Sequence, residues 1–351
     1  MLINKAYRYE LDPNNIQRSS LAQHAGVARF VYNWGLEQRI ARYKNNQGDD
    51  RFTDAMKQHK LLNSLKRDQF QWMYETSKCA PQEALRDLHS AFKNFYRGLK
   101  SGKNIGFPRF KKRGIRDSFR LTGIIRFHER AIQLPRIGKI RIKEKRKIYC
   151  SGRILSATVR RRANRWFVSV TVEDELPDPQ PVRGSPMGAD LGVKTLATLS
   201  DGTTIANPRA LGRRLRKLKK LSKSLSRRQK GSKNREKAKL RLAKMYLKVF
   251  NIRQDTLHKV TTYLAKSHST VVIEDLLVSG MMKNRRLARV IADVGFYEFR
   301  RQLEYKCQWY GSKLVVVSRT FPSSKMCSRC GHRKKELSLY QRGSIIVNSV
   351  G

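Results

Sequence analysis

The segment from Arg209 to Lys244 constrains the fold of this chain more than any other. It contains 17 Lys or Arg residues and a single acid, Glu236. Leucines recur at near-heptad spacing, and beyond Gly231 the apolar series resumes, which predicts a basic antiparallel helical hairpin over 209–266. One carboxylate cannot balance so many cations by salt bridges. The hairpin is therefore predicted to lie at the surface, either facing water or in contact with phosphates.

The charge excess extends along most of the chain. Lys and Arg number 76 against 27 Asp and Glu, which gives a formal net charge of +49. Such a charge repels itself unless a polyanion neutralises it, so DNA or RNA is the expected partner. An acidic membrane surface is the alternative, but membrane binding usually comes from one basic helix or cluster. We therefore expect nucleic acid and no membrane.

Hydropathy and cysteine usage favour a cytoplasmic protein. No apolar run approaches the roughly 18 residues of a membrane span, and the N-terminus lacks a signal-peptide core. The five cysteines are scattered and do not resemble a disulfide framework, which favours a reducing compartment. They are Cys79, Cys150, Cys307, Cys327 and Cys330. The first three are predicted to be small buried side chains.

The predicted secondary structure changes twice in the first half of the chain. Residues 2–12 alternate as in a strand, and residues 13–100 are predicted to be mainly helical, with one helix starting at Pro81. From 101 to 180 the signals are short and strand-like, including a hairpin that turns at Ala163-Asn164. The proline-rich stretch 175–181 is typical of a linker.

The second half alternates strands with helices. Two strands are predicted over 187–199, a buried strand over 270–273, a helix near 295–310 and a last strand over 313–317. This alternation predicts an α/β layer.

Two acids, Asp190 and Glu274, lie in or at the end of these apolar strands, where an unpaired carboxylate is costly. Carboxylates on adjacent strands of a buried sheet are how two-metal phosphodiesterases hold Mg²⁺, since hard cations take oxygen ligands. Asp190 and Glu274 are therefore candidate catalytic and Mg²⁺-binding residues. The alternative is that each acid only ends a strand or pairs with a nearby cation.

A second metal motif lies near the C-terminus. Cys327 and Cys330 form a CxxC followed by glycine, and His332 is a candidate third ligand. A closed tetrahedral zinc site needs four ligands, so this is half of a site. Bound Zn²⁺ and two free surface thiols remain alternatives.

Basic residues in two segments are the candidate nucleic-acid contacts, because exposed guanidinium and ammonium groups neutralise backbone phosphates. They are Arg109, Lys111, Lys112, Arg213, Arg214, Lys217, Lys220, Arg227, Arg228, Lys230, Lys233 and Arg235.

Six motifs, in this order, resemble those of one family. They are Ala28-Arg29-Phe30-Val31-Tyr32-Asn33-Trp34, Gly106-Phe107-Pro108-Arg109-Phe110-Lys111, Gly188-Ala189-Asp190-Leu191-Gly192-Val193-Lys194, Gly231-Ser232-Lys233-Asn234-Arg235, Ile273-Glu274-Asp275-Leu276, and the segment from Phe321 to Gly331. The sequence resembles TnpB, the RNA-guided DNA nucleases encoded by insertion sequences and related to the type V CRISPR effectors. The resemblance runs from about residue 3 to about residue 340.

The resemblance implies an α+β multidomain protein. It implies a helical recognition lobe over 13–100, a wedge-like β-barrel from 1–12 plus 101–180, and a RuvC nuclease domain of RNase H fold over 186–351. It maps the first catalytic Asp onto Asp190 and the catalytic Glu onto Glu274, with Mg²⁺ as cofactor. Cys327 and Cys330 match the first half of a zinc ribbon over 321–335. The implied partners are a guide RNA and a double-stranded DNA target.

The chain departs from the family pattern after residue 331. The family continues with a second Cys pair and an Asp-Arg-Asp segment that supplies a third catalytic carboxylate, whereas residues 332–351 contain no Cys, no Asp and one acid, Glu336. We therefore predict a C-terminally truncated endonuclease with impaired catalysis. The alternatives are a nuclease-dead RNA-guided DNA-binding regulator, an RNase H-fold transposase, or a generic RNA-packaging protein. The paired strand acids argue against the last.

Overall fold

The computed structural model describes residues 1–44, 55–144, 152–175 and 177–319. Contacts group the chain into two compact units. The first consists of Met1–Pro177 and Gln229–Lys244, and the second of Asp178–Arg228 and the residues from Met245 onward. The boundary at Pro177 falls inside the predicted linker.

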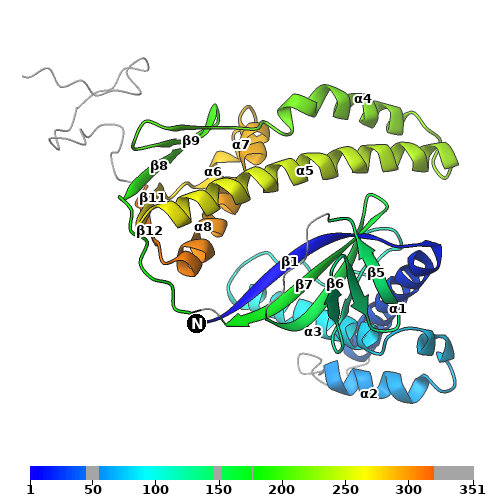
Figure 1. Cartoon of the computed structure of the whole chain (residues 1–351). Helices are drawn as coiled ribbons and strands as arrows, with labels where there is room; N and C mark the ends of the chain where they lie inside the picture. The colour runs from blue at the N-terminus through cyan, green and yellow to red at the C-terminus, as the bar shows by residue number, and fades with distance from the viewer. Residues whose placement is uncertain (45–54, 145–151, 176, 320–351) are drawn as a thin grey trace, which may run out of the picture. The chain divides into compact units, whose positions relative to one another are not determined.

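An antiparallel sheet forms the body of the first unit (Figure 1). Its strand order is β2-β6-β7-β1-β5-β4-β3, so the predicted N-terminal strand β1 pairs with both β7 and β5. No pairing joins β2 to β3 within the described ranges, and closure into a barrel stays a prediction. The strands are β1 Leu2–Asp12, β2 Ser118–Leu121, β3 Arg126–His128, β4 Ala131–Leu134, β5 Gly138–Ile142, β6 Arg153–Arg162 and β7 Arg165–Glu175.

The predicted hairpin is confirmed as β6 and β7, with Arg162 paired to Arg165. Ala163 and Asn164 have φ angles of 49° and 61°. Two residues with positive φ match the twist of the flanking strands, and asparagine tolerates this region better than most residues. Val159 and Val168, which pair across the strands, are fully buried, so the period-two pattern places one face in the core.

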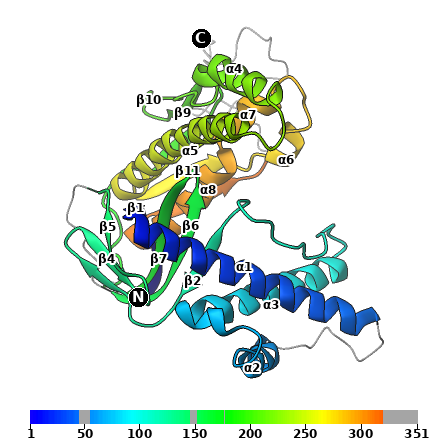
Figure 2. The ribbon, with the colours of Figure 1, turned by 90° about the vertical axis from the view of Figure 1, so that its right-hand side faces the viewer.

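Helices of the predicted helical region share one hydrophobic core with this sheet. They are α1 Asn15–Lys44, α2 Ala55–Leu65, the 3-10 helix Gln71–Glu75 and α3 Cys79–Lys100. Figures 1 and 2 show α1 and α3 side by side, and both contact β2. Pro81 lies in the first turn of α3, which begins two residues earlier than predicted. Leu85, Leu88 and Phe92 face the core, as their spacing indicates.

The second unit contains a mixed five-stranded sheet of order β10-β9-β8-β11-β12. Strand β8 runs antiparallel to β9 and parallel to β11, and β11 runs parallel to β12. The strands predicted over 187–199, 270–273 and 313–317 are thereby confirmed. Their bounds are β8 Met187–Leu191, β9 Thr195–Leu199, β10 Thr204–Ala206, β11 Thr270–Glu274 and β12 Lys313–Val317.

Two of the helices correspond to the predicted basic hairpin, α4 Leu215–Ser226 and α5 Lys233–Ser267. The Ser232 hydroxyl accepts a hydrogen bond from the Arg235 N–H and so caps α5. The predicted helix near 295–310 is α8, and its Phe299 and Leu303 are fully buried in the core of the second unit. The other helices are the 3-10 helix Gly212–Arg214, α6 Val278–Met281, α7 Ala288–Val294 and α8 Phe296–Tyr310.

Within the described ranges, no helix is both long and apolar enough to cross a membrane. Cys79 and Cys307 are free and buried, as predicted. Cys150, Cys327, Cys330, His332 and Glu336 lie outside the described residues, so the zinc half-site stays a prediction.

Candidate functional site

Asp190 and Glu274 meet at one end of the second sheet. The parallel pairing of β8 with β11 aligns Ala189 with Ile273, and each acid is the next residue on its strand. Ala189 and Ile273 are buried, whereas Asp190 is exposed and Glu274 half-buried. Because side chains alternate across a strand, both carboxylates lie on the face opposite to the core residues that precede them.

The negative charge of Glu274 acts on Asp190. Partial desolvation raises the pKa of Asp190 above its ordinary value, although its side chain is exposed, and the negative charge of Glu274 raises it further. The Asp190 side chain has no hydrogen bond or ion pair with any residue in the described part of the chain. The fold thus holds two carboxylates near each other at a free-energy cost that a cation would relieve.

Asp275, the acid that directly follows β11, has opposite surroundings. The Asp275 carboxylate accepts hydrogen bonds from Arg300 (2.5 Å) and from the Nε of Arg319 (2.7 Å). Arg319 also donates to the Asp275 carbonyl at 3.0 Å, and the Asp275 N–H donates to Val317 at 3.0 Å. Burial would raise the pKa of Asp275, but the two arginines outweigh it and lower the pKa. Asp275 is therefore occupied by arginines.

A pocket of about 440 Å³ opens beside Glu274 and Asp275. Residues that follow β11 form one wall, and α8 provides the other with Phe296, Tyr297 and Arg300. Tyr297 is 71% exposed, so an aromatic face is available to a ligand within reach of the acids. The pocket contains apolar, aromatic and cationic side chains, a combination that suits a nucleotide.

The donor set suits a hard divalent cation, but it is incomplete. Carboxylate oxygens are the ligands that Mg²⁺ prefers, and the mutual repulsion of Asp190 and Glu274 favours a cation between them. No cluster of three or more His, Cys, Asp or Glu residues that could hold a metal occurs among the described residues. Two carboxylates are therefore what this part of the chain offers.

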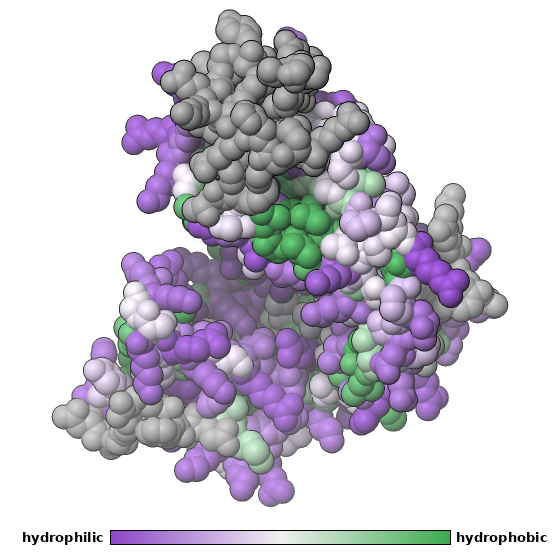
Figure 3. Space-filling model, turned by 90° about the vertical axis from the view of Figure 1, so that its left-hand side faces the viewer, coloured by the Kyte–Doolittle hydropathy of each residue, from purple (hydrophilic) through white to green (hydrophobic). Residues whose placement is uncertain are grey.

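The predicted nucleic-acid contacts on the basic helices are largely at the surface. Arg213, Lys217, Lys220, Arg227, Lys230 and Lys233 are exposed, and Arg214, Arg228 and Arg235 are half-buried. The molecular face in Figure 3 is mostly hydrophilic, as the charge of the chain requires. These positions are available to a polyanion, and their role stays a prediction.

In the other basic segment, Arg109 and Lys112 are exposed but Lys111 is not. Its ammonium lies 3.8 Å from the centre of the Tyr32 ring, and its backbone exchanges hydrogen bonds with the Asn33 side chain. Burial lowers the pKa of Lys111, which the charge of Asp87 only partly offsets. Lys111 therefore joins this segment to α1, a contact that the sequence did not predict.

Sequence reasoning also missed a cluster of arginines on the first sheet. Arg8 lies over the Phe167 ring at 4.5 Å. Burial lowers the pKa of Arg8, and so do the charges of Arg162 and Arg160. The sequence contains part of this pattern, because Arg160 and Arg162 are two residues apart on β6 and therefore share one face. It does not show that Arg8 of β1, about 150 residues away, joins them.

Models of three families match the chain. One described as "Probable transposase" matches residues 167–285, a Cas12f1-like TNB domain matches 296–346, and a helix-turn-helix domain matches 1–48. Residues 1–44 of this chain form β1 and the single helix α1, so no helix-turn-helix is present in the described part of that match.

Relatives of known family match nearly the full chain. A protein of Escherichia coli (strain K12) named "Putative RNA-guided DNA endonuclease InsQ" is 34% identical over 96% of this chain and 86% of its own length. A "Putative RNA-guided DNA endonuclease" of Streptomyces pristinaespiralis is 36% identical over 97% of this chain and 84% of its own length. The chain belongs to the TnpB family. Its sequence resemblance to that family is thereby confirmed.

A solved structure supports the fold of this TnpB family member. The Cas12f1 chain in a complex with sgRNA and target DNA aligns with a TM-score of 0.52 and 16% identity, over 93% of this chain and 78% of the other. At that identity the likeness concerns the fold. The α+β architecture predicted from sequence is confirmed at this level.

Proposed function

We propose that this TnpB family member is an RNA-guided DNA endonuclease of an insertion sequence, with Asp190 and Glu274 as its catalytic acids. The observation that carries the proposal is the approach of these two carboxylates on parallel strands, where the charge of Glu274 raises the pKa of Asp190. The strand order β10-β9-β8-β11-β12, with β9 antiparallel to β8, supports the RNase H-like core that we propose for this unit. The names of the relatives agree with this activity.

In this proposal each unit has its own role. Asp190 and Glu274 would hold Mg²⁺, which when bound polarises a phosphodiester and stabilises the charge that develops on it. The rigid pairing of β8 with β11 keeps the carboxylates together, and the pocket beside Glu274 accepts the nucleotide. The exposed cations of α4 and α5 neutralise backbone phosphates of a guide RNA and a double-stranded DNA target.

We further propose that catalysis by the 351-residue chain is impaired. Asp275 is held by Arg300 and Arg319, so it is a poor substitute for a third metal ligand. Loss of one preorganised charge-stabilising group commonly costs about 10²–10³ in rate, and a missing metal ligand should cost at least as much. RNA-guided binding without cutting is therefore the second candidate function.

The test starts from protein purified without nuclease treatment. RNA should copurify, visible as 260 nm absorbance that ribonuclease removes, and sequencing this RNA defines the matched DNA target. Binding and Mg²⁺-dependent cutting of that target are then measured separately, with the E. coli relative as the reference.

We expect RNA-guided binding of the DNA target, with a cutting rate at least about 10²-fold lower than that of the reference. The Asp190→Ala variant should lose any remaining cutting and keep binding. Cutting at the reference rate would show that catalysis is not impaired. Cutting that survives in Asp190→Ala would remove Asp190 from the site, and absence of RNA and DNA binding would overturn the proposed function.

A further inference from the structure

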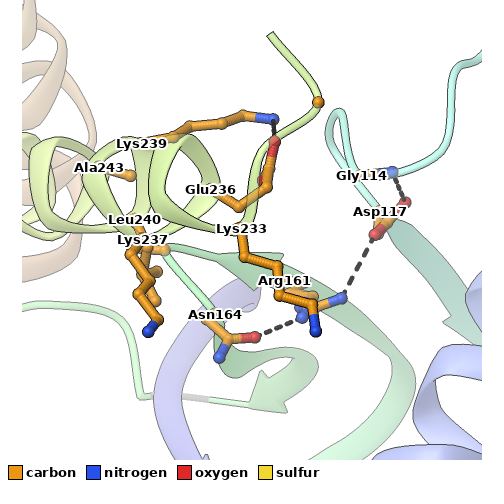
Figure 4. Close-up of a pocket in the computed structure, with 12 residues that line it drawn as sticks. Gly114, Asp117, Arg161, Asn164, Lys233, Glu236, Lys237, Lys239, Leu240 and Ala243 are labelled. Atoms are coloured by element: carbon orange, nitrogen blue, oxygen red, sulfur yellow. Dashed lines mark hydrogen bonds and ion pairs between the residues drawn. The ribbon is translucent and has the colours of Figure 1, made fainter. Parts of the chain in front are cut away.

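A second pocket, of about 630 Å³, lies within the first unit (Figure 4). The first turns of α5 form one wall, and the β6–β7 turn with the segment before β2 forms the other. Four cations and two carboxylates line it, which leaves an excess of two positive charges. The charged lining residues are Asp117, Arg161, Lys233, Glu236, Lys237 and Lys239.

Both carboxylates of this pocket already have partners. Asp117 accepts a hydrogen bond from the Gly114 N–H at 3.1 Å and pairs with Arg29 at 3.4 Å. Glu236 pairs with Lys239 at 3.6 Å, one turn along α5. Figure 4 shows the Lys239 side chain extending along α5 toward Glu236. Asp117 is shared between Arg29 and Arg161 and Glu236 pairs with Lys239, so neither acid forms an ion pair with Lys233 or Lys237.

Lys233 and Lys237 remain as uncompensated charges. They lie four residues apart on α5, so they share one face of the helix. Both are exposed, and neither has a carboxylate within 4.0 Å in the described ranges. Two like charges on one helix face repel each other, and an anion between them would remove that cost.

The Arg161 side chain, on the opposite wall of the pocket, is restricted by three contacts. Its guanidinium donates to the Asn164 side chain and lies 4.0 Å from Asp117. It also lies 5.9 Å from the centre of the Trp166 ring. These contacts restrict a side chain that otherwise has many rotamers, so less conformational entropy is lost when it binds a ligand. A guanidinium presents paired donors that match two oxygens of a phosphate.

We propose that this pocket binds a backbone phosphate of a nucleic acid, through Arg161 on one wall and Lys233 and Lys237 on the other. The inference rests on the proposed function for the identity of the polyanion. One phosphate would then be bound by three side chains, Arg161, Lys233 and Lys237. Lys233 and Lys237, which bind, thus differ from Lys239, which is neutralised by Glu236.

The experiment uses the full chain, stripped of copurified RNA in high salt and then titrated with that RNA at several salt concentrations. The double variant Lys233→Gln/Lys237→Gln should bind about tenfold or more weakly, because hydrogen bonds to charged groups are lost. Its log K against log salt plot should flatten by about 1, as expected for lost phosphate contacts. All these side chains are exposed, so the thermal unfolding midpoint should not change.

The matched control is Lys239→Gln, which removes the same charge from the same helix. It should weaken binding far less than Lys237→Gln alone. Asn164→Gly tests the support of Arg161, since glycine keeps the positive φ of the turn while removing the amide. An equal loss in Lys239→Gln and Lys237→Gln would show a general charge effect and overturn the proposal, as would unchanged binding in the double variant.

A second arm identifies the source of the phosphate. Protein saturated with RNA is titrated with the matched duplex DNA. Weaker RNA binding by the double variant in the first titration assigns the phosphate to the RNA. Weaker DNA binding in the second titration, with RNA binding unchanged, assigns it to the DNA. If the unsubstituted protein bound neither nucleic acid, the proposed function itself would fail, which is a different outcome from an unaffected double variant.

Discussion

Two regions of the second unit place carboxylates at the ends of secondary structure and surround them in opposite ways. Asp293 lies near the end of α7. Its carboxylate accepts hydrogen bonds from the N–H groups of Leu211 (2.9 Å) and Gly212 (3.0 Å), at the start of the 3-10 helix before α4, and it pairs with Arg253 at 3.1 Å. At the end of the second sheet, Asp190 faces Glu274 without such partners among the described residues. The first carboxylate is compensated by hydrogen bonds and an ion pair, whereas the charge of the second is opposed by that of Glu274.

The same contrast separates two adjacent residues. Glu274 belongs to the acid pair, whereas Asp275 is held by Arg300 and Arg319. The electrostatic cost at this end of the sheet therefore falls on Asp190, where the proposed chemistry needs negative charge, and not on Asp275. A fold that tolerates such a cost at one site usually has a functional reason for it, since stability and activity often conflict.

The largest expected effect concerns the compensated acid. Asp293→Ala removes a buried carboxylate and leaves Arg253 without its partner, so the free energy of unfolding should fall by about 3–5 kcal/mol. Denaturant unfolding measures it. As a control, Asp255→Ala removes an exposed helical pair with Lys259 and should cost no more than about 0.5 kcal/mol. Equal effects would show that the surroundings of the two acids do not decide their contribution.

A buried cation without a carboxylate partner sharpens the comparison. The Lys306 ammonium is buried and donates to the His258 carbonyl and to the hydroxyls of Thr261 and Thr262 at 2.7–2.8 Å. Burial lowers the pKa of Lys306 to about 8, and Glu298 only partly offsets this.

The unfolded chain keeps the Lys306 proton up to about pH 10.5, whereas the folded chain releases it near pH 8. The loss of stability that comes from burying the charged ammonium is therefore complete below pH 8 and disappears as the pH rises toward 10.5. Over this window the stability of the protein should rise by up to about 3 kcal/mol relative to Lys306→Met. The free energy of unfolding of both proteins, measured from pH 7.5 to 10, tests this. Parallel curves would contradict the assignment.

The smallest effect is expected at the acid pair. Asp190→Asn removes the repulsion from Glu274, so the metal-free protein should be as stable as the wild type or more stable, by less than about 1 kcal/mol. Because the folded pKa of Asp190 is raised, the cost appears as the pH rises through that pKa, and the gain should vanish in acid.

Thermal unfolding at pH 7 and below pH 4 in a chelator measures this gain. The control is Asp201→Asn, where the carboxylate accepts a hydrogen bond from the Thr203 N–H at 2.8 Å and no stabilisation is expected. A clear loss of stability in Asp190→Asn would show that the Asp190 carboxylate stabilises the metal-free fold, which contradicts the repulsion from Glu274.

Local patterns predicted many of the elements. Alternation located β1, β6 and β7, and Ala163-Asn164 located their turn, because the constraint on positive φ acts on the residues themselves. Asp190 and Glu274 could be paired as candidates since each lies in or at the end of a run of strand residues. One boundary was less accurate: α3 begins at Cys79 instead of Pro81, because proline is accepted anywhere in a first turn, where its missing N–H is not needed.

The sequence by itself determined the exposed basic helices, the strands that carry the acids and the family of the protein. Charge density, period and motif order depend on neighbouring residues and can be read without a fold. Only the tertiary structure decided which charges are compensated. Asp275 meets Arg300 and Arg319 across 25 and 44 residues, and Lys239 differs from Lys237 because Glu236 reaches only the former. Electrostatic energy depends on distances of a few ångströms, and the folded chain sets those distances.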